Sequence, residues 1–389
     1  MNRPALFEPM RVRGLTFANR IVVAPMCQYS ARDGQMSDWH LIHLGQLALS
    51  GAALLTIEAT AVEPAGRITW ADVGLWDDAT EAAMARTIEG VRRWSDMPIA
   101  VQLAHAGRKA STEVPWAGGH GLAADDPHGW PIVAPSPLAT GPDAQTPAAL
   151  DAAGLARVRE AFVQATRRAV RIGVDAIQIH AAHGYLLHQF LSPLTNQRGD
   201  AYGGSLENRM RFVLEVFAAV REAAPDRPVS VRISATDWID CGWDLKQSIE
   251  LAKRLEAAGC DAIHVSSGGL AATQRIPVGP GYQVPHARGI KAAVGIPVVA
   301  VGLITGYEQA ETIVASGDAD FVALARTVLY DPRWPWHAAA ALGGQVRAPK
   351  QYLRSQPSQY KQLFGVSGPV SPEPRWLAGE GLRVSLAGD

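Results

Sequence analysis

Short runs of apolar residues alternate with longer stretches of helical periodicity along most of the chain. Eight of these runs are nearly continuous in apolar residues, which is the pattern of strands buried on both faces. They are Arg20–Met26, Ala53–Glu58, Ile99–Leu103, Ala176–His180, Val229–Ser234, Ala262–Ser266, Pro297–Val301 and Asp320–Leu324. Helices are predicted between most of the runs, for example at Leu155–Gly173, Arg209–Ala224, Leu245–Gly259 and Tyr307–Gly317.

The repeated strand–helix unit predicts an α/β fold in which the parallel strands close a (β/α)8 TIM barrel. The alternative is an open nucleotide-binding sheet of the Rossmann type. No G-x-G-x-x-G motif follows any of the runs, and the first run continues into PMCQYS, which argues against that alternative. Catalytic groups of TIM barrels lie at the carboxyl ends of the strands, so the polar residues there are the candidates for chemistry.

Two segments depart from the repeated unit. The connection after the third strand, residues 105–149, is rich in Gly, Pro, Trp and Asp and has little helical periodicity. A connection of this length usually carries a lid or a binding loop. We therefore expect residues 1–345 to form a single barrel domain with a lid-like insertion. We expect residues 346–389 to form a C-terminal arm that reaches another subunit or is partly disordered.

Composition and charge narrow the functional class. Of the 389 residues, 48% are hydrophobic and 19% are charged, and the formal net charge is -1. This balance is typical of a globular enzyme and argues against binding to nucleic acid or to a membrane surface. Cys27, Cys241 and Cys260 are far apart, so neither a disulfide framework nor a cysteine-only metal site is expected. We find no signal-peptide run and no apolar run of membrane-spanning length, and we expect a cytoplasmic protein.

The motif HAAHGY follows the fourth strand and carries His180, His183 and Tyr185. Two neutral imidazoles that point together would donate hydrogen bonds to one substrate oxygen and stabilise an enolate there. The phenol of Tyr185 would then deliver a proton. The alternatives are a pair of structural histidines, or a metal site, which would need a third ligand that the motif does not supply.

Gln102 and Arg232 occupy otherwise apolar strands, so their polar heads need partners at the mouth of the barrel. A flat heterocycle with carbonyl groups and ring nitrogens would satisfy both, and the cation would stabilise its reduced, anionic form. The alternative for Arg232 is an internal salt bridge, for example to Glu58. Cys27 at the end of the first strand suits a nucleophile, a residue that tunes a cofactor, or a small buried side chain.

The loops after the seventh and eighth strands are the positions where TIM barrels often bind phosphate. Gly302 allows close approach of a ligand to the backbone, and Arg326 would pair with a phosphate group. A tight turn and a surface arginine explain the same residues equally well, and both interpretations stay open at this point.

Taken together, the motifs resemble the Old Yellow Enzyme family, and within it the thermophilic-like class that includes the xenobiotic reductases. The matching stretches run from about residue 6 to about residue 355. They are NRIVVAPMCQYS, EATAVEPAGRIT, QLAHAGRKAS, IQIHAAHGYLLHQFLSPLTNQRGDAYGGSLENRMRF, VRIS, FVALARTVLYDP and PKQYLR.

The resemblance implies a non-covalent FMN across the mouth of the barrel, with NADPH or NADH as the reductant. The residues implied to line the FMN are Ala24, Pro25, Met26, Cys27, Ala59, Gln102, Arg232, Gly302, Ala325 and Arg326. It also implies that His180 and His183 hold the substrate oxygen, that Tyr185 donates the proton, and that Tyr29 faces the substrate. A homodimer or homotetramer is implied, in which Arg354 reaches the active site of the neighbouring subunit.

The implied reaction is the ping-pong reduction of small molecules with a C=C bond conjugated to a carbonyl or nitro group. Hydride comes from flavin N5 and the proton from Tyr185. The bifunctional dienoyl-CoA reductases of the family carry an iron–sulfur cluster, which three scattered cysteines would not bind. Two other functions remain as alternatives: a lyase or aldolase that works without flavin, and a flavin-binding sensor without turnover.

Overall fold

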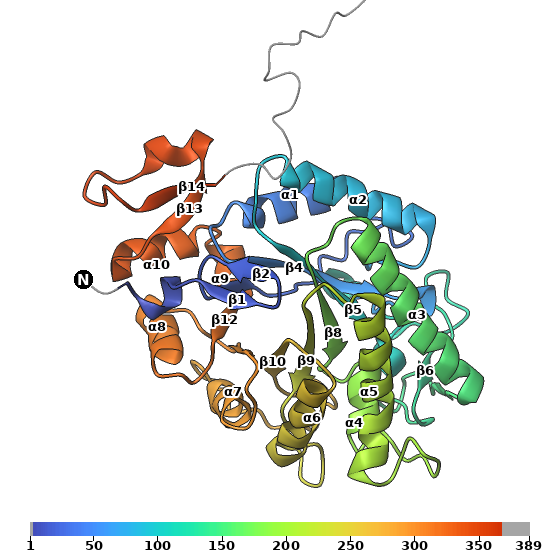
Figure 1. Cartoon of the computed structure of the whole chain (residues 1–389). Coiled ribbons are helices and arrows are strands. Elements are labelled where there is room, and N and C mark those ends of the chain that lie inside the picture. The colour runs from blue at the N-terminus through green and yellow to red at the C-terminus, as the bar shows by residue number, and fades with distance from the viewer. Residues whose placement is uncertain (1–2, 368–389) are drawn as a thin grey trace, which may run out of the picture.

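The computed structural model describes residues 3–367, and eight parallel strands within it close into a barrel (Figure 1). In order around the barrel they are β3 (Ile21–Val23), β4 (Leu54–Ala61), β5 (Ile99–Ala104), β8 (Ala176–Ala181), β9 (Val229–Ser234), β10 (Ala262–Ser266), β11 (Val298–Ala300) and β12 (Phe321–Leu324). Each lies within or overlaps one of the apolar runs. The predicted TIM barrel is therefore confirmed.

Helices surround the barrel and cover the outer faces of the strands (Figure 1). They are α1 (Asp38–Ala48), α2 (Asp78–Arg92), α3 (Ala152–Arg171), α5 (Leu206–Ala223), α6 (Leu245–Ala257), α7 (Val284–Lys291) and α8 (Tyr307–Ala315), with short helices α4 (Leu186–Leu191), α9 (Arg326–Tyr330) and α10 (Trp334–Leu342). The four helices predicted by periodicity are present. Helix α5 begins earlier than its apolar pattern suggested because Ser205 caps it, accepting a hydrogen bond from the Asn208 N–H.

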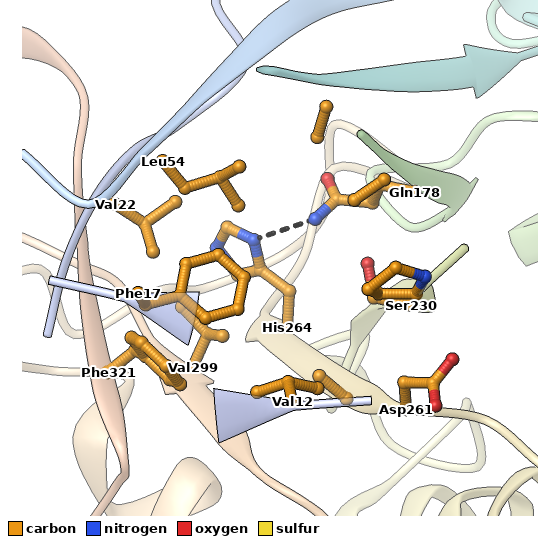
Figure 2. Close-up of a pocket in the computed structure, with 14 residues that line it drawn as sticks. Val12, Phe17, Val22, Leu54, Gln178, Ser230, Asp261, His264, Val299 and Phe321 are labelled. Carbon is orange, nitrogen blue, oxygen red and sulfur yellow. Dashed lines mark hydrogen bonds between the residues drawn. The ribbon is translucent and has the colours of Figure 1, made fainter. Parts of the chain in front are cut away.

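A hairpin closes the amino end of the barrel. Its strands, β1 (Met10–Val12) and β2 (Leu15–Phe17), pair antiparallel, and Phe17 packs edge-to-face on Phe321 with ring centroids 5.4 Å apart. Beneath the hairpin lies a cavity of about 50 Å³, and much of its lining comes from the first residues of barrel strands. Figure 2 shows Gln178 and Ser230 on one side of this cavity and aliphatic and aromatic side chains on the other, with the ring of His264 among the latter and linked to Gln178. This small cavity leaves little room for a ligand beneath the hairpin.

The lid-like insertion contains no α-helix, in agreement with its lack of periodicity. It consists of loops with two 3-10 turns, η3 (Gly107–Lys109) and η4 (Pro115–Ala117), and one pair of two-residue strands, β6 (Val133–Ala134) and β7 (Ala148–Ala149). Arg108 anchors its first turn, since its guanidinium donates to the backbone oxygen of Leu270, 2.9 Å away, in the loop after β10.

The first part of the predicted C-terminal arm packs on its own barrel. Strand β13 (Val346–Pro349) pairs with β14 (Phe364–Ser367), and the 3-10 helix η5 (Lys350–Ser355) joins them. Trp336 of α10 contacts Phe364 with ring centroids 4.7 Å apart. Residues 368–389 of the predicted arm lie outside the described residues. Among the helices of residues 3–367, none has the length and apolar character needed to cross a bilayer.

Candidate active site

The carboxyl end of β8 brings His180, His183 and Tyr185 into one cluster. The imidazole rings of His180 and His183 have centroids 5.1 Å apart, and the ring of Tyr185 lies 5.0 Å from that of His180. The planes cross at 86° and 87°, so both contacts are edge-to-face. The three residues that HAAHGY was predicted to bring together are therefore neighbours at the mouth of the barrel.

The turn that carries these residues depends on a tight backbone contact. His183 and Gly184 both have positive φ, 58° and 74°, and a Cβ atom at position 184 would lie 2.3 Å from the Gly269 oxygen. Only glycine fits there without displacing the loop after β10. The backbone N–H of His183 donates to Ser234 Oγ at 2.9 Å. This last residue of β9 therefore holds the strained turn in place.

Hydrogen bonds define the tautomers of the two histidines. The Ala182 N–H donates to His180 Nδ1 at 3.2 Å, so a neutral His180 carries its proton on Nε2. That atom lies 3.3 Å from His183 Nδ1, and His183 Nε2 lies 2.7 Å from Ser266 Oγ. Burial, and after it the charge of Arg232, hold the pKa of both imidazoles well below the usual value. Both rings are therefore neutral at neutral pH, and each has one N–H group to donate.

Tyr185 is also kept in its neutral form. Burial raises the pKa of its phenol well above the usual value, and the thiol of Cys27 adds to the increase. The proton of Tyr185 is therefore present throughout the neutral range, as a proton donor requires.

Arg232 is a buried cation that lacks a carboxylate partner. It is 8% exposed, its Nε has no hydrogen-bond partner, and no ion pair joins it to a carboxylate within residues 3–367. Glu58, the alternative partner, instead accepts from the Gln28 N–H at 2.7 Å and lies 3.3 Å from His40 Nε2. Burial lowers the pKa of Arg232 to about 10, so the guanidinium stays charged at neutral pH. Such a charge calls for an electron-rich group from outside the chain.

Gln102 has a partner inside the barrel. Its Nε2 donates to Gln178 Oε1 at 2.7 Å, and Gln178 Nε2 lies 3.3 Å from His264 Nδ1, the contact drawn in Figure 2. This bond uses one N–H of the Gln102 amide. The amide oxygen and the second N–H are not used by it, and they suit the carbonyl groups and ring nitrogens of a flat heterocycle.

A cavity of about 660 Å³ extends from Arg232 to the loops after β11 and β12. Its lining includes Gly302, Ala325 and Arg326, the residues predicted to lie near a phosphate. Gly302 has a φ of 121°, and a Cβ there would lie 2.7 Å from Gln283 Nε2, so glycine is required. A buried guanidinium at one end and an exposed arginine at the other match the ring and the phosphate of FMN.

Cys27 follows β3 and is half-buried. Burial raises the pKa of its thiol well above the usual value, followed by the charges of Asp72 and Glu58, while hydrogen bonds with the Ala59 backbone and the Tyr29 side chain oppose the shift. A nucleophilic cysteine needs a lowered pKa, so this environment favours a neutral thiol that tunes a cofactor.

We expect Cys27→Ala to shift the midpoint potential of the bound flavin and to leave turnover within about tenfold, because a weak S–H contact is lost and no bond-forming group is removed. Potentiometric titration and steady-state assays of the variant test this. Cys260→Ala is the matched control. Cys260 is buried just before β10, at the end of the strand opposite to Ser266, and it hydrogen-bonds to the Ala262 backbone oxygen. Complete inactivation of Cys27→Ala would instead identify the thiol as a nucleophile.

Most of the other predicted residues lie at the same end of the barrel. Ala24, Pro25 and Met26 directly follow β3, and Ala59 lies within β4, where a bulge shifts the register beside it. Arg354 is different: it is exposed on η5, which packs against β13 and β14. Its own subunit therefore does not bring Arg354 into the cluster.

Three further residues join the site: Ser234, Ser266 and Lys109. The two serines end β9 and β10 and contact His183. Lys109, in the first turn of the lid, donates to the His183 backbone oxygen at 2.9 Å. Their positions at or just beyond the ends of strands could have marked them as site residues in the sequence. Position along a strand, however, does not show which residues each side chain contacts. Within residues 3–367, no three His, Cys, Asp or Glu side chains are grouped to hold a metal ion.

Comparison with known proteins identifies the family of the chain. Residues 5–344 match the NADH:flavin oxidoreductase / NADH oxidase family. The chain is 44% identical over 351 residues to an NADPH dehydrogenase of Geobacillus thermodenitrificans, covering 90% of this chain and 98% of that protein. It is 43% identical over 364 residues to an NADH:flavin oxidoreductase of Gibberella zeae, covering 89% and 88% of the two chains.

Among solved structures, morphinone reductase in complex with tetrahydroNAD superposes on this chain with a TM-score of 0.70. The two are 28% identical, and the superposition covers 94% of this chain and 95% of that one. The chain therefore belongs to the NADH:flavin oxidoreductase / NADH oxidase family, the family of the Old Yellow Enzymes, and is an FMN-dependent oxidoreductase that takes its electrons from NAD(P)H.

Proposed function

We propose that this enzyme reduces C=C bonds conjugated to a carbonyl or nitro group. The observation that carries the proposal is the cluster of two neutral imidazoles and one neutral phenol, with ring contacts of 5.1 and 5.0 Å. Reduction of an activated alkene needs two kinds of group. Hydrogen-bond donors hold the oxygen of the carbonyl or nitro group, and a separate proton donor protonates the carbon. A lyase without flavin would leave the buried charge of Arg232 without a partner.

The proposed cofactor contacts follow from the unpartnered Nε of Arg232 and from the residues that line the cavity beside it. Arg232 and Gln102 would hold the polar edge of the FMN ring, Cys27 and the neighbouring residues of β3 and β4 would line it, and Arg326 would pair with the phosphate. When bound, FMN supplies the hydride chemistry that couples NAD(P)H oxidation to reduction of the substrate.

His180 and His183 would bind the carbonyl or nitro oxygen of the substrate. Because both rings are neutral donors, they stabilise negative charge that develops on that oxygen without giving up a proton. This polarises the C=C bond and makes its β-carbon a hydride acceptor. Tyr185 then transfers the proton from its hydroxyl oxygen to the α-carbon, and the resulting phenolate takes a proton from solvent.

We further propose that the nicotinamide and the substrate use the same site in turn, which gives ping-pong kinetics. Morphinone reductase, the structural neighbour, was solved with tetrahydroNAD. No strand of residues 3–367 is followed by the glycine-rich motif of a separate dinucleotide-binding domain. A shared site explains how one barrel serves both reactants.

Isotope labelling tests the proposed reaction. In H2O, NADPH deuterated at the transferred position should place deuterium on the β-carbon of cyclohexenone, and in D2O unlabelled NADPH should place it on the α-carbon. Cyclohexene, which has no carbonyl to bind the histidines, is the matched control and should not be reduced. Absence of any saturated ketone, or solvent deuterium at both carbons, would refute the proposal.

Assembly and compartment belong to the same proposal. We propose a homo-oligomer in which the exposed Arg354 reaches the active site of the neighbouring subunit, in a reducing, cytoplasmic setting. Sedimentation velocity gives the oligomeric state. If Arg354 serves the neighbouring site, Arg354→Ala should raise the KM for the enone at unchanged oligomeric state.

A further inference from the structure

Lys109 is a lysine at the start of the lid whose ammonium group reaches into the active site. It is only partly exposed. Its Nζ donates to the backbone oxygens of His183 at 2.9 Å and Gly269 at 3.0 Å. The same Nζ lies 4.8 Å from the centroid of the Tyr185 ring. One cation therefore contacts the oxygen-binding turn, the loop after β10 and the proton donor.

The two backbone contacts join loops that already touch. A Cβ at position 184 would lie 2.3 Å from the Gly269 oxygen, and a Cβ at position 269 would lie 2.6 Å from the His183 Cα. Arg108 independently holds the second loop through the Leu270 oxygen at 2.9 Å. The position of the loops therefore does not depend on Lys109 alone. The charge of Lys109 can have a second role besides holding these loops.

The contact with Tyr185 provides that role. A cation over an aromatic face is attracted to the ring, and it stabilises a phenolate more than a phenol because the phenolate is negatively charged. Burial has the opposite effect and raises the pKa of Tyr185. The charge of Arg232 lowers this pKa, and an ammonium group 4.8 Å from the ring would act in the same direction when the phenol loses its proton.

The charge is present at neutral pH. Burial, and after it the charge of Arg108, lower the pKa of Lys109 to about 8, so most molecules carry the ammonium form at pH 7. Within residues 3–367, no carboxylate forms an ion pair with Lys109. Its field is therefore not cancelled by a neighbouring negative charge in direct contact.

We propose that Lys109 is a positioning residue for proton transfer: its ammonium group holds Tyr185 in place and stabilises the phenolate that forms when the α-carbon is protonated. This inference rests on the proposed role of Tyr185. It assigns to the first turn of the insertion a part in the oxidative half-reaction.

The test is a double-mutant cycle on the anaerobic reoxidation of the reduced enzyme by cyclohexenone, followed by stopped-flow absorbance. Lys109→Met removes the charge and keeps the length of the side chain, Lys109→Gln keeps a donor for the two carbonyl groups, and Lys109→Arg keeps the charge. Lys253→Met, at an exposed position of α6, is the matched control. Flavin content and melting temperature of each variant report whether it folds.

We expect both neutral variants to slow reoxidation about tenfold, as loss of a desolvated cation–π contact would. Lys109→Arg should stay within about threefold, and both neutral variants should slow flavin reduction by NADPH less than they slow reoxidation. In a Tyr185→Phe background, Lys109→Met should cause no further slowing. If Lys109→Met does not bind flavin, the reoxidation rate of Lys109→Gln is used as the test.

Two results would overturn the inference and leave the proposed function intact: wild-type reoxidation by Lys109→Gln, or an equal slowing by Lys109→Met with and without Tyr185. Normal reoxidation by Tyr185→Phe itself would overturn the proton-donor assignment, and this inference with it. The two failures are therefore distinguishable.

Discussion

Tyr185→Phe is expected to slow reoxidation of the reduced enzyme by cyclohexenone by about 10²- to 10⁴-fold, the range typical of a lost general acid. Reduction of the flavin by NADPH should change by less than about twofold, because no proton from the phenol enters that half-reaction. The ring of Phe fills the same space against His180, where the contact is 5.0 Å and nearly perpendicular. The substitution therefore removes the proton and retains the packing.

Stopped-flow traces of the two half-reactions, recorded separately, test this expectation. Tyr202→Phe is the matched control, since the hydroxyl of Tyr202 bonds to Glu215 on α5, outside the cluster. Equal slowing of both half-reactions by Tyr185→Phe would point to a general disturbance of the site and would contradict the proton-donor assignment.

His183→Ala is expected to weaken the binding of phenols to the oxidised enzyme and to slow reoxidation by about 10²- to 10³-fold, as loss of one oxyanion donor does. A phenolate oxygen mimics the enolate oxygen, so its affinity reports on the same two imidazoles. Titration of the flavin absorbance with a para-substituted phenol gives this affinity directly.

Because the backbone at position 183 has a positive φ, the effect of His183→Ala has to be compared with that of a second variant. Its φ is 58°, a conformation that alanine adopts with strain and asparagine tolerates better. His183→Asn keeps both a suitable backbone and a neutral donor, so it should retain phenol binding within about tenfold. Phenol affinity in His183→Ala equal to that of the wild type would remove His183 from the oxygen-binding site. An equal loss in both variants would mean that the imidazole ring itself is needed.

The eight strands could be predicted because burial on both faces leaves a continuous apolar pattern that few other structures share. The cluster at the mouth could be predicted for a related reason. In a parallel barrel all carboxyl ends meet, so His180 at the end of β8 and Arg232 within β9 had to face a common space. The register confirms this, since the two residues are paired between β8 and β9.

The partners of individual side chains could not be predicted in the same way. Glu58 was a reasonable partner for Arg232, yet it accepts from the Gln28 N–H and lies beside His40, because those groups come from the loop after β3 and from α1. Lys109 contacts residues of two other loops, and those contacts depend on how the lid folds back. Irregular loops carry no periodic pattern, so their contacts appear only in three dimensions.

The C-terminal segment illustrates the same limit. The sequence predicted a C-terminal arm over residues 346–389, and in the described part of this segment β13 pairs with β14 and Phe364 packs against Trp336. These residues are few and punctuated by Gly, Ser and Pro, so their apolar contacts give too short a pattern to recognise.

We propose that one flavin site accepts electrons from NAD(P)H and passes them to an activated alkene. The anaerobic visible spectrum of the purified protein, taken before NADPH, after NADPH, and again after cyclohexenone, tests this directly. We expect a flavin band that bleaches with NADPH and returns with the enone. A protein that remains colourless after incubation with FMN, or a bleached band that cyclohexenone does not restore, would contradict it.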